Sequence, residues 1–243
     1  MFQGYTDETF EFFMAIRFNN NRDFFQGSHD WYLRAVREPS LRLAEALDPV
    51  IEAMDENLER RANRVVSRIN RDLRFSRDKS PYRDYIWLAW RVPGEQRSTT
   101  LGVYFDISDQ GSSYGMGYYE DNRPLMNALR RRMASEPEAI LEAMSPIAAD
   151  FSFTQVRPIK RIAIPDSVPE ALRVWYPTRG FYFSKDLNDF SLLKSAALVD
   201  ELSDGFRRMT PLYRYIRSVP PEADEDRTVE RDAKRLLDGI PVD

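Results

Sequence analysis

Positive charge is concentrated in one stretch of this chain, between Arg60 and Arg83. The stretch contains nine Lys and Arg residues and two Asp residues, whereas the whole chain has a net charge of −4. Cations this close together repel one another unless acids from elsewhere in the chain, or an anionic ligand, lie opposite them. The stretch is therefore a candidate binding site for an anion.

The residue types in this stretch suit the recognition of phosphate or carboxylate groups. Guanidinium groups offer planar, paired donors, and lysine adds a compact point charge. The turn from Ser76 to Pro81 can also expose backbone N–H groups to an anion. If the segment before this turn is extended, alternate side chains project from one face about 7 Å apart. The residues predicted to bind a small anionic ligand, such as a phosphorylated compound, are Arg68, Arg71, Arg74, Ser76, Lys79 and Tyr82.

The same residues leave open whether the protein is an enzyme or a binding module. In an enzyme, Asp72 or Asp78 would be the candidate acid or base, with the neighbouring cations stabilising negative charge. In a purely structural alternative, the arginines form a network of ion pairs with Asp23, Glu38 or Asp106. The sequence does not decide between these alternatives.

A further alternative is nucleic-acid binding through the basic stretch, with Phe75, Tyr82 and Tyr85 stacking on bases. The isoelectric point of about 5.3 argues against it, because nucleic-acid-binding domains are typically basic. Nucleic acid is therefore an unfavoured partner, and a protein partner bound through the C-terminal tail is a third hypothesis. The oligomeric state is left open.

Absent residue types restrict the chemistry. The chain has no cysteine and a single histidine, His29, so a thiol nucleophile is excluded and a zinc site would need carboxylates almost alone. No glycine-rich nucleotide-binding loop is present. We therefore predict no metal site, and the sequence indicates no particular cofactor. A histidine at a helix start is expected to be a surface or capping residue.

The apolar runs of the chain are short. None approaches the roughly 18 residues that a membrane helix requires, so no membrane span is predicted. The N-terminus shows neither a basic leader nor a continuous apolar stretch. Together with the absence of cysteine, this pattern favours a cytoplasmic location.

Hydrophobic periodicity predicts the elements that must position the basic stretch. Helices are predicted at 7–19, 28–58 with a new segment at Pro39, 122–150 with a break at Pro137, 189–204 and 205–217, with a short helix after Ser167. Strands are predicted at 65–75, 85–92, 99–108, 112–119 and 180–184. Residues 109–111 form the turn of a hairpin, while residues 151–169 give no clear pattern.

Consecutive strands joined by short turns indicate an antiparallel sheet. The predicted fold is α+β, an antiparallel sheet packed against several helices, in a single domain at residues 5–219. Beyond the boundary at Pro220-Pro221, residues 220–243 are predicted to form a charged C-terminal helix or tail.

The basic stretch also resembles a known family signature. The matching residues are Arg68, Arg71-Asp72, Arg74-Phe75-Ser76, Asp78-Lys79 and Pro81-Tyr82, and they are similar to the signature of the family known as domain of unknown function 2461. Upstream residues 19–25, Tyr32 and Glu38-Pro39, and downstream Met209, Pro211 and Leu212, resemble the family pattern too. The resemblance spans Tyr5 to Val219. It implies an α+β domain and supplies no established activity.

Overall fold

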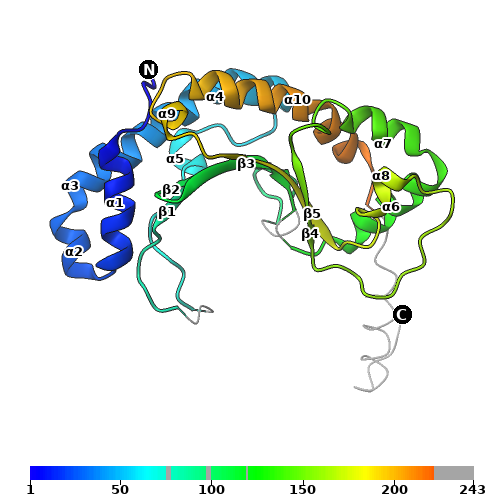
Figure 1. Ribbon diagram of the computed structural model, residues 1–243, viewed down its shortest axis with the longest axis horizontal. Coiled ribbons are helices and arrows are strands. Elements are labelled where there is room, and N and C mark those ends of the chain that lie inside the picture. The colour runs from blue at the N-terminus through cyan, green and yellow to red at the C-terminus, as the bar shows by residue number, and fades with distance from the viewer. Residues whose placement is uncertain (75–77, 97–99, 119, 222–243) are drawn as a thin grey trace.

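The computed structural model describes residues 1–74, 78–96, 100–118 and 120–221. Its centre is a five-stranded antiparallel sheet with the strand order β1-β2-β3-β5-β4. Helices cover one face of this curved sheet, so the chain has the predicted α+β fold (Figure 1). The strands are β1 (Tyr85–Trp90), β2 (Gly102–Ser108), β3 (Gly111–Gly117), β4 (Ser152–Val156) and β5 (Gly180–Leu187).

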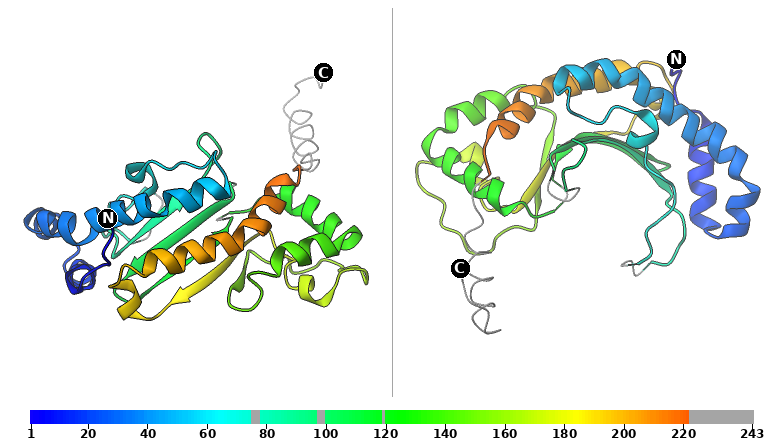
Figure 2. Two further views of the ribbon diagram at one scale, coloured as in Figure 1. Left: turned by 90° about the horizontal axis from the view of Figure 1, so that it is seen from above. Right: turned by 180° about the vertical axis from the view of Figure 1, so that it is seen from behind.

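Two long helices, α4 and α10, lie side by side across the convex face of the sheet (Figure 2). The N-terminal helices extend past one end of the strands, beside the β2–β3 turn, and α6, α7 and α8 lie at the other end. The helices are α1 (Asp7–Phe18), α2 (Arg22–Gly27), α3 (His29–Tyr32), the π-helical turn η1 (Leu33–Arg37), α4 (Glu38–Met54), α5 (Ala62–Val65), α6 (Arg123–Ser135), α7 (Pro137–Met144), α8 (Glu170–Arg173), α9 (Phe190–Leu193) and α10 (Leu198–Ser218).

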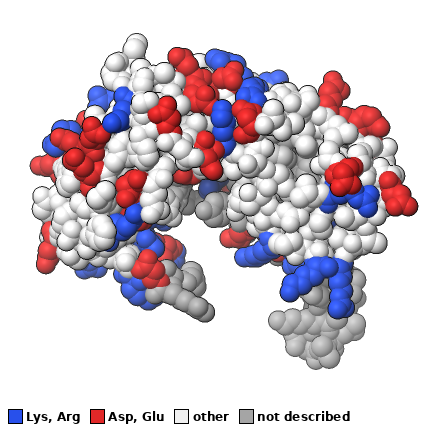
Figure 3. All heavy atoms as spheres, in the orientation of Figure 1, with Lys and Arg blue, Asp and Glu red and all other residues white. Residues whose placement is uncertain are grey.

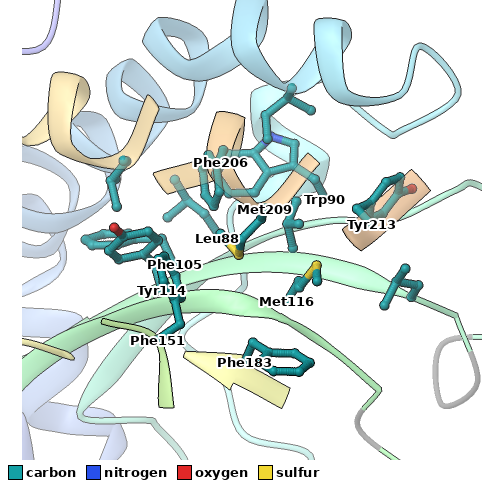
Figure 4. Close-up of a cluster of buried hydrophobic side chains, with 14 of the residues drawn as sticks. Leu88, Trp90, Phe105, Tyr114, Met116, Phe151, Phe183, Phe206, Met209 and Tyr213 are labelled. Atoms are coloured by element: carbon teal, nitrogen blue, oxygen red, sulfur yellow. The ribbon is translucent and has the colours of Figure 1, made fainter. Parts of the chain in front are cut away.

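The hydrophobic core lies between the convex face and these two helices (Figure 4). Trp90, Val103 and Met116 follow one another across β1, β2 and β3, and each is fully buried. The indole of Trp90 meets the ring of Phe206 from α10 edge to face, with 5.6 Å between the ring centroids. Burial of alternate residues on one face leaves the other residues of every strand on the concave face.

Pro39 lies in the first turn of α4, and the helix is continuous with α3 through η1. Because proline has no N–H, it cannot bond to the carbonyl four residues earlier, at Ala35. The hydroxyl of Thr9 in α1 donates to that carbonyl instead, at 2.6 Å. The proline therefore leaves the helix intact, and the freed acceptor bonds α1 to the long helix.

The strand predicted at 65–75 is wrong. After α5 the chain forms two irregular limbs, residues 66–74 and 78–84, here together called the basic ribbon, with isolated bridges from Val66 to Leu88 and from Asn70 to Tyr82. Arg71 donates its backbone N–H to the carbonyl of Pro81, at 2.9 Å. Because a proline offers no N–H in return, a regular ladder cannot continue at this point.

Smaller differences concern boundaries. The helices predicted at 189–204 and 205–217 are one short helix, α9, and one continuous helix, α10, which passes through Gly205. Strand β4, at the edge of the sheet, was not predicted. The terminal helix predicted within residues 220–243 lies almost wholly outside the described residues. Among the described residues, no helix combines the length and apolar content needed to cross a membrane.

Candidate functional site

The basic ribbon leads into β1 and lies at one side of the space on the concave side of the sheet (Figure 1). Two of its predicted ligand residues pair with acids of the ribbon itself: Arg71 with Asp78 at 2.5 Å and Arg74 with Asp72 at 2.7 Å. The acids suggested from the sequence as partners are not used for these two arginines. The Arg74–Asp72 pair is solvent-exposed, and Asp78 is the exposed partner of the partly buried Arg71. Exposed ion pairs are weak, so both acids can be exchanged for an anionic ligand.

The other predicted ligand residues differ in their accessibility. Arg68 is exposed, and Lys79 is exposed with its Nζ donating to the carbonyl of Leu73 at 3.0 Å. Tyr82 is buried, its ring is stacked on Phe25, and its backbone bonds to the side chain of Asn20. Tyr82 therefore fastens the ribbon to α2, while Ser76 lies outside the described residues.

The two candidate acids are held in the ionised state. Hydrogen bonds from the side chain and backbone of Arg74 lower the pKa of Asp72 to about 2. The pKa of Asp78 is lowered as well, chiefly by hydrogen bonds from Ser80. A carboxylate with a lowered pKa is a weak proton acceptor and is not a proton donor near neutral pH.

The concave face of the sheet brings together polar residues that were not among the predicted ligand residues. In register across four strands lie Trp87, Asp106, Ser113 and Asp186. The next row of the same face is formed by Ala89, Tyr104, Gly115, Ser184 and Ser152. Space-filling atoms show a deep hollow beneath this face, between the N-terminal half and the α6–α8 end of the molecule (Figure 3).

Asp106 is the central charged group of this face. Ser113 donates its hydroxyl to the carboxylate at 2.8 Å. Burial raises the pKa of Asp106, and the negative charge of Asp186 acts in the same direction, while the bonds from Ser113 oppose both effects. Within the described residues, no Lys or Arg forms an ion pair with Asp106 or Asp186. The face thus carries two carboxylates that lack a cationic partner.

Tyr104 neighbours this pair on the same face. Burial raises the pKa of its hydroxyl to about 12, against the effect of hydrogen bonds with Ser113 and Ser184. The hydroxyl therefore stays protonated at neutral pH and can act as a hydrogen-bond donor.

Arg83 connects the basic ribbon with the concave face. Its Nη1 donates to the carbonyls of Arg68 at 2.7 Å and Asn70 at 2.6 Å. Its guanidinium also lies over the ring of Trp87, 4.4 Å from the centroid. Since Trp87 stands directly opposite Asp106 in the strand register, the Arg83 guanidinium lies at the Trp87 end of this row.

A charge without a partner at a half-buried position destabilises the native state. We expect Asp106→Asn to raise the melting temperature at neutral pH, by roughly 2–4 °C if the free energy of unfolding rises by about 1 kcal/mol. The acid has a native pKa above its unfolded value of about 3.9, so stability falls as the pH rises through the interval between the two. The gain of the variant should therefore vanish at low pH, as thermal unfolding at several pH values would show.

Asp109→Asn is the matched control. The Asp109 carboxylate is buried and pairs with Arg17 at 2.5 Å, so its loss should lower the melting temperature. An Asp106→Asn protein that melts at or below the wild-type temperature at neutral pH would contradict the electrostatic description of this face.

A second cavity of about 520 Å³ lies where α4 ends beside α10. Among its lining side chains, Tyr213 donates to Asp55 at 2.8 Å, and Arg217 pairs with Glu95 at 2.7 Å. In the described part of the chain, no three His, Cys, Asp or Glu residues are grouped so that they could hold a metal ion.

The fold and the site define an α+β protein in which helices cover the convex face of an antiparallel sheet and leave a polar concave face open. The model of the family described as conserved hypothetical protein (DUF2461) matches residues 8–215. The chain belongs to this family, as the resemblance of the basic stretch indicated. No curated protein matches the chain.

Proposed function

We propose that the protein binds a small anionic ligand, such as a phosphate-bearing metabolite, in the hollow beneath the sheet. The basic ribbon supplies positive charge at the side of the hollow, and the concave face forms its floor. The observation that carries this proposal is the position of Arg83, which joins the cationic ribbon to the floor through Trp87. Small-ligand sites combine aromatic surface with a few placed polar groups in this way.

The proposal extends the expectation drawn from the basic stretch, with a cytoplasmic location as part of it. Arg68, Arg74 and Lys79 are the exposed cations of the ribbon that would face the ligand, and the exposed partner Asp72 can yield its place to an anion. Arg71 is partly buried and contributes mainly to the shape of the ribbon. The proposal leaves open whether binding is followed by a reaction.

Thermal unfolding in the presence of phosphate-bearing and carboxylate-bearing metabolites tests this function. A ligand at a hundred times its dissociation constant stabilises the folded state by about 2.7 kcal/mol, which is a shift of roughly 5–10 °C for a chain of this size. We expect Arg74→Ala and Arg68→Ala to reduce this shift while leaving the unliganded melting temperature within about 2 °C of the wild type. Both side chains are exposed, so folding itself should tolerate the changes.

Arg34→Ala is the matched control, because Arg34 forms an exposed ion pair with Glu8 on the N-terminal helices. It should retain the full ligand-induced shift. If no anionic metabolite shifts the melting temperature, or if all three variants lose the shift equally, the proposal is wrong. Stabilisation by polynucleotides alone, with a steep dependence on salt, would replace it with nucleic-acid binding.

A further inference from the structure

The pair formed by Asp106 and Asp186 lacks a partner that its chemistry requires. Both side chains lie in one row of the concave face, one on each side of Ser113. Ionised carboxylates only accept hydrogen bonds, and Ser113 donates to Asp106 from its hydroxyl and from its backbone. Both residues belong to the concave face of the sheet, which borders the hollow. A ligand seated there must bring hydrogen-bond donors of its own.

The adjacent cations restrict which donors fit. An ammonium group would satisfy two carboxylates, but Arg83 beside Trp87 repels a cationic ligand that lies over the same row. Hydroxyl groups donate without carrying charge, and they form strong, charge-assisted bonds to carboxylates. The floor therefore selects a neutral, hydroxylated part of the ligand, while Arg83 and the ribbon select an anionic part.

The shape of the floor suits a ring. Gly115 stands between Tyr104 and Ser184 in the second row, and Gly102 and Gly117 face each other in the third. None of these three residues has a side chain that could project into the hollow, and the Arg91 side chain lies beside Gly102. Trp87, Tyr104 and Tyr182 belong to the same face and provide aromatic surface around Gly115 and Gly117. Adjacent strands lie about 4.8 Å apart, so the three spacings from Trp87 on β1 to Asp186 on β5 amount to about 14 Å between the backbones. Because side chains reach inward from both ends, one small molecule can span the cation beside Trp87 and the carboxylate of Asp186.

We infer that the ligand of the hollow is a phosphorylated sugar, whose hydroxyl groups are bound by Asp106 and Asp186 and whose phosphate is bound by Arg83 and the basic ribbon. This inference rests on the proposed function and specifies its ligand class. Ser113 fixes the orientation of the Asp106 carboxylate, and Tyr104 supplies a donor for a ring or hydroxyl oxygen of the ligand. A sugar without phosphate would contact only the carboxylates, and phosphate without a sugar would contact only Arg83 and the basic ribbon.

Isothermal titration calorimetry with the full chain tests the inference. The probes are glucose 6-phosphate, fructose 6-phosphate, ribose 5-phosphate, inorganic phosphate and glucose. At least one sugar phosphate should bind ten times or more tightly than inorganic phosphate and than glucose. Asp106→Asn and Asp186→Asn should weaken its binding about tenfold, because each change turns a charge-assisted hydrogen bond into a neutral one.

The response to inorganic phosphate separates this inference from a general loss of the site. Each Asp→Asn change removes a negative charge near the phosphate, so it should leave the affinity for inorganic phosphate unchanged or raise it. The same change should lower the affinity for the sugar phosphate. Asp30→Asn, at a fully exposed carboxylate on α3, should change neither affinity.

Failure of the sugar phosphate assignment and failure of anion binding give different results. If the sugar phosphates bind no more tightly than inorganic phosphate, or if both Asp variants leave sugar phosphate binding unchanged, the inference is wrong while anion binding stands. If no phosphate-bearing probe and no other anionic metabolite binds, the proposed function fails with it. Tight binding of glucose alone would overturn the phosphorylated part of the assignment.

Discussion

Gly115→Ala is expected to destabilise the protein by about 3 kcal/mol, the upper part of the range for overpacking a well-filled interior. A Cβ atom at this position would collide with the backbone carbonyl of Phe183 and would come within 2.9 Å of Cα of Ser184. The obstacle is main chain of the neighbouring strand, so no side chain can rotate away. Strands β3 and β5 would have to separate in the middle of the sheet.

Urea denaturation of the wild type and the variant measures this effect. Gly27→Ala is the matched control, because a Cβ atom at Gly27 would meet nothing within 4 Å and its backbone lies outside the left-handed region. The control should be neutral or stabilise by about 0.5 kcal/mol, as expected when glycine loses freedom in the unfolded chain. If Gly115→Ala were as stable as the wild type, the close approach of β3 and β5 would be incorrect.

Arg130→Met is expected to cost about 3 kcal/mol or more. The Arg130 side chain is almost fully buried on α6, where Nε donates to the carbonyl of Tyr176 at 2.8 Å and Nη2 to that of Thr178 at 2.5 Å. A methionine fills similar space but leaves two buried carbonyls without donors, and each such loss costs about 1–3 kcal/mol. Residues 176–178 lead directly into β5, so the change also loosens the strand that carries Asp186.

The half-exposed neighbour Arg132 provides the comparison on the same helix. Its Nη1 pairs with Glu136 at 2.6 Å, an exposed i,i+4 pair. Arg132→Met should change the free energy of unfolding by well under 1 kcal/mol. Equal unfolding midpoints for the two variants in urea would show that the carbonyls of Tyr176 and Thr178 find other donors.

The elements that were predicted well are those in which local pattern and tertiary environment agree. In the β2–β3 hairpin, strict alternation separates buried Val103 and Phe105 from Tyr104 and Asp106, and Gly111 adopts the positive φ that the turn requires. Pro137 begins α7 in its first turn, as predicted. Such signals lie within a few residues of one another, so the sequence is sufficient to place them.

The predictions that failed depend on partners far away in the chain. Alternation at 65–75 suggested a strand, but pairing with a return limb that contains Pro81 prevents a regular ladder. Strand β4 is a short edge strand whose existence depends on β5 and whose sequence is flanked by prolines. Helix α10 continues through Gly205. The ring of Tyr114 packs against this position, so a side chain there would collide with it, and the glycine serves this close packing rather than a break between two helices.

Only part of the candidate site was accessible to sequence reasoning. The basic stretch was found from its charge, while Asp106 was named only as a possible ion-pair partner of the arginines. Asp186 lay beyond the predicted end of the last strand, which the structure extends to Leu187. The register that sets Asp106, Ser113 and Asp186 in one row involves strands separated by about eighty residues, and no local pattern reports it.

The bond from Thr9 to the carbonyl of Ala35 has an evolutionary consequence. A proline at position 39 is tolerable while a hydroxyl at position 9 replaces the missing amide, so the two positions form one unit of selection. Relatives that lose the hydroxyl should lose the proline as well, and the correlation would be visible between two positions thirty residues apart.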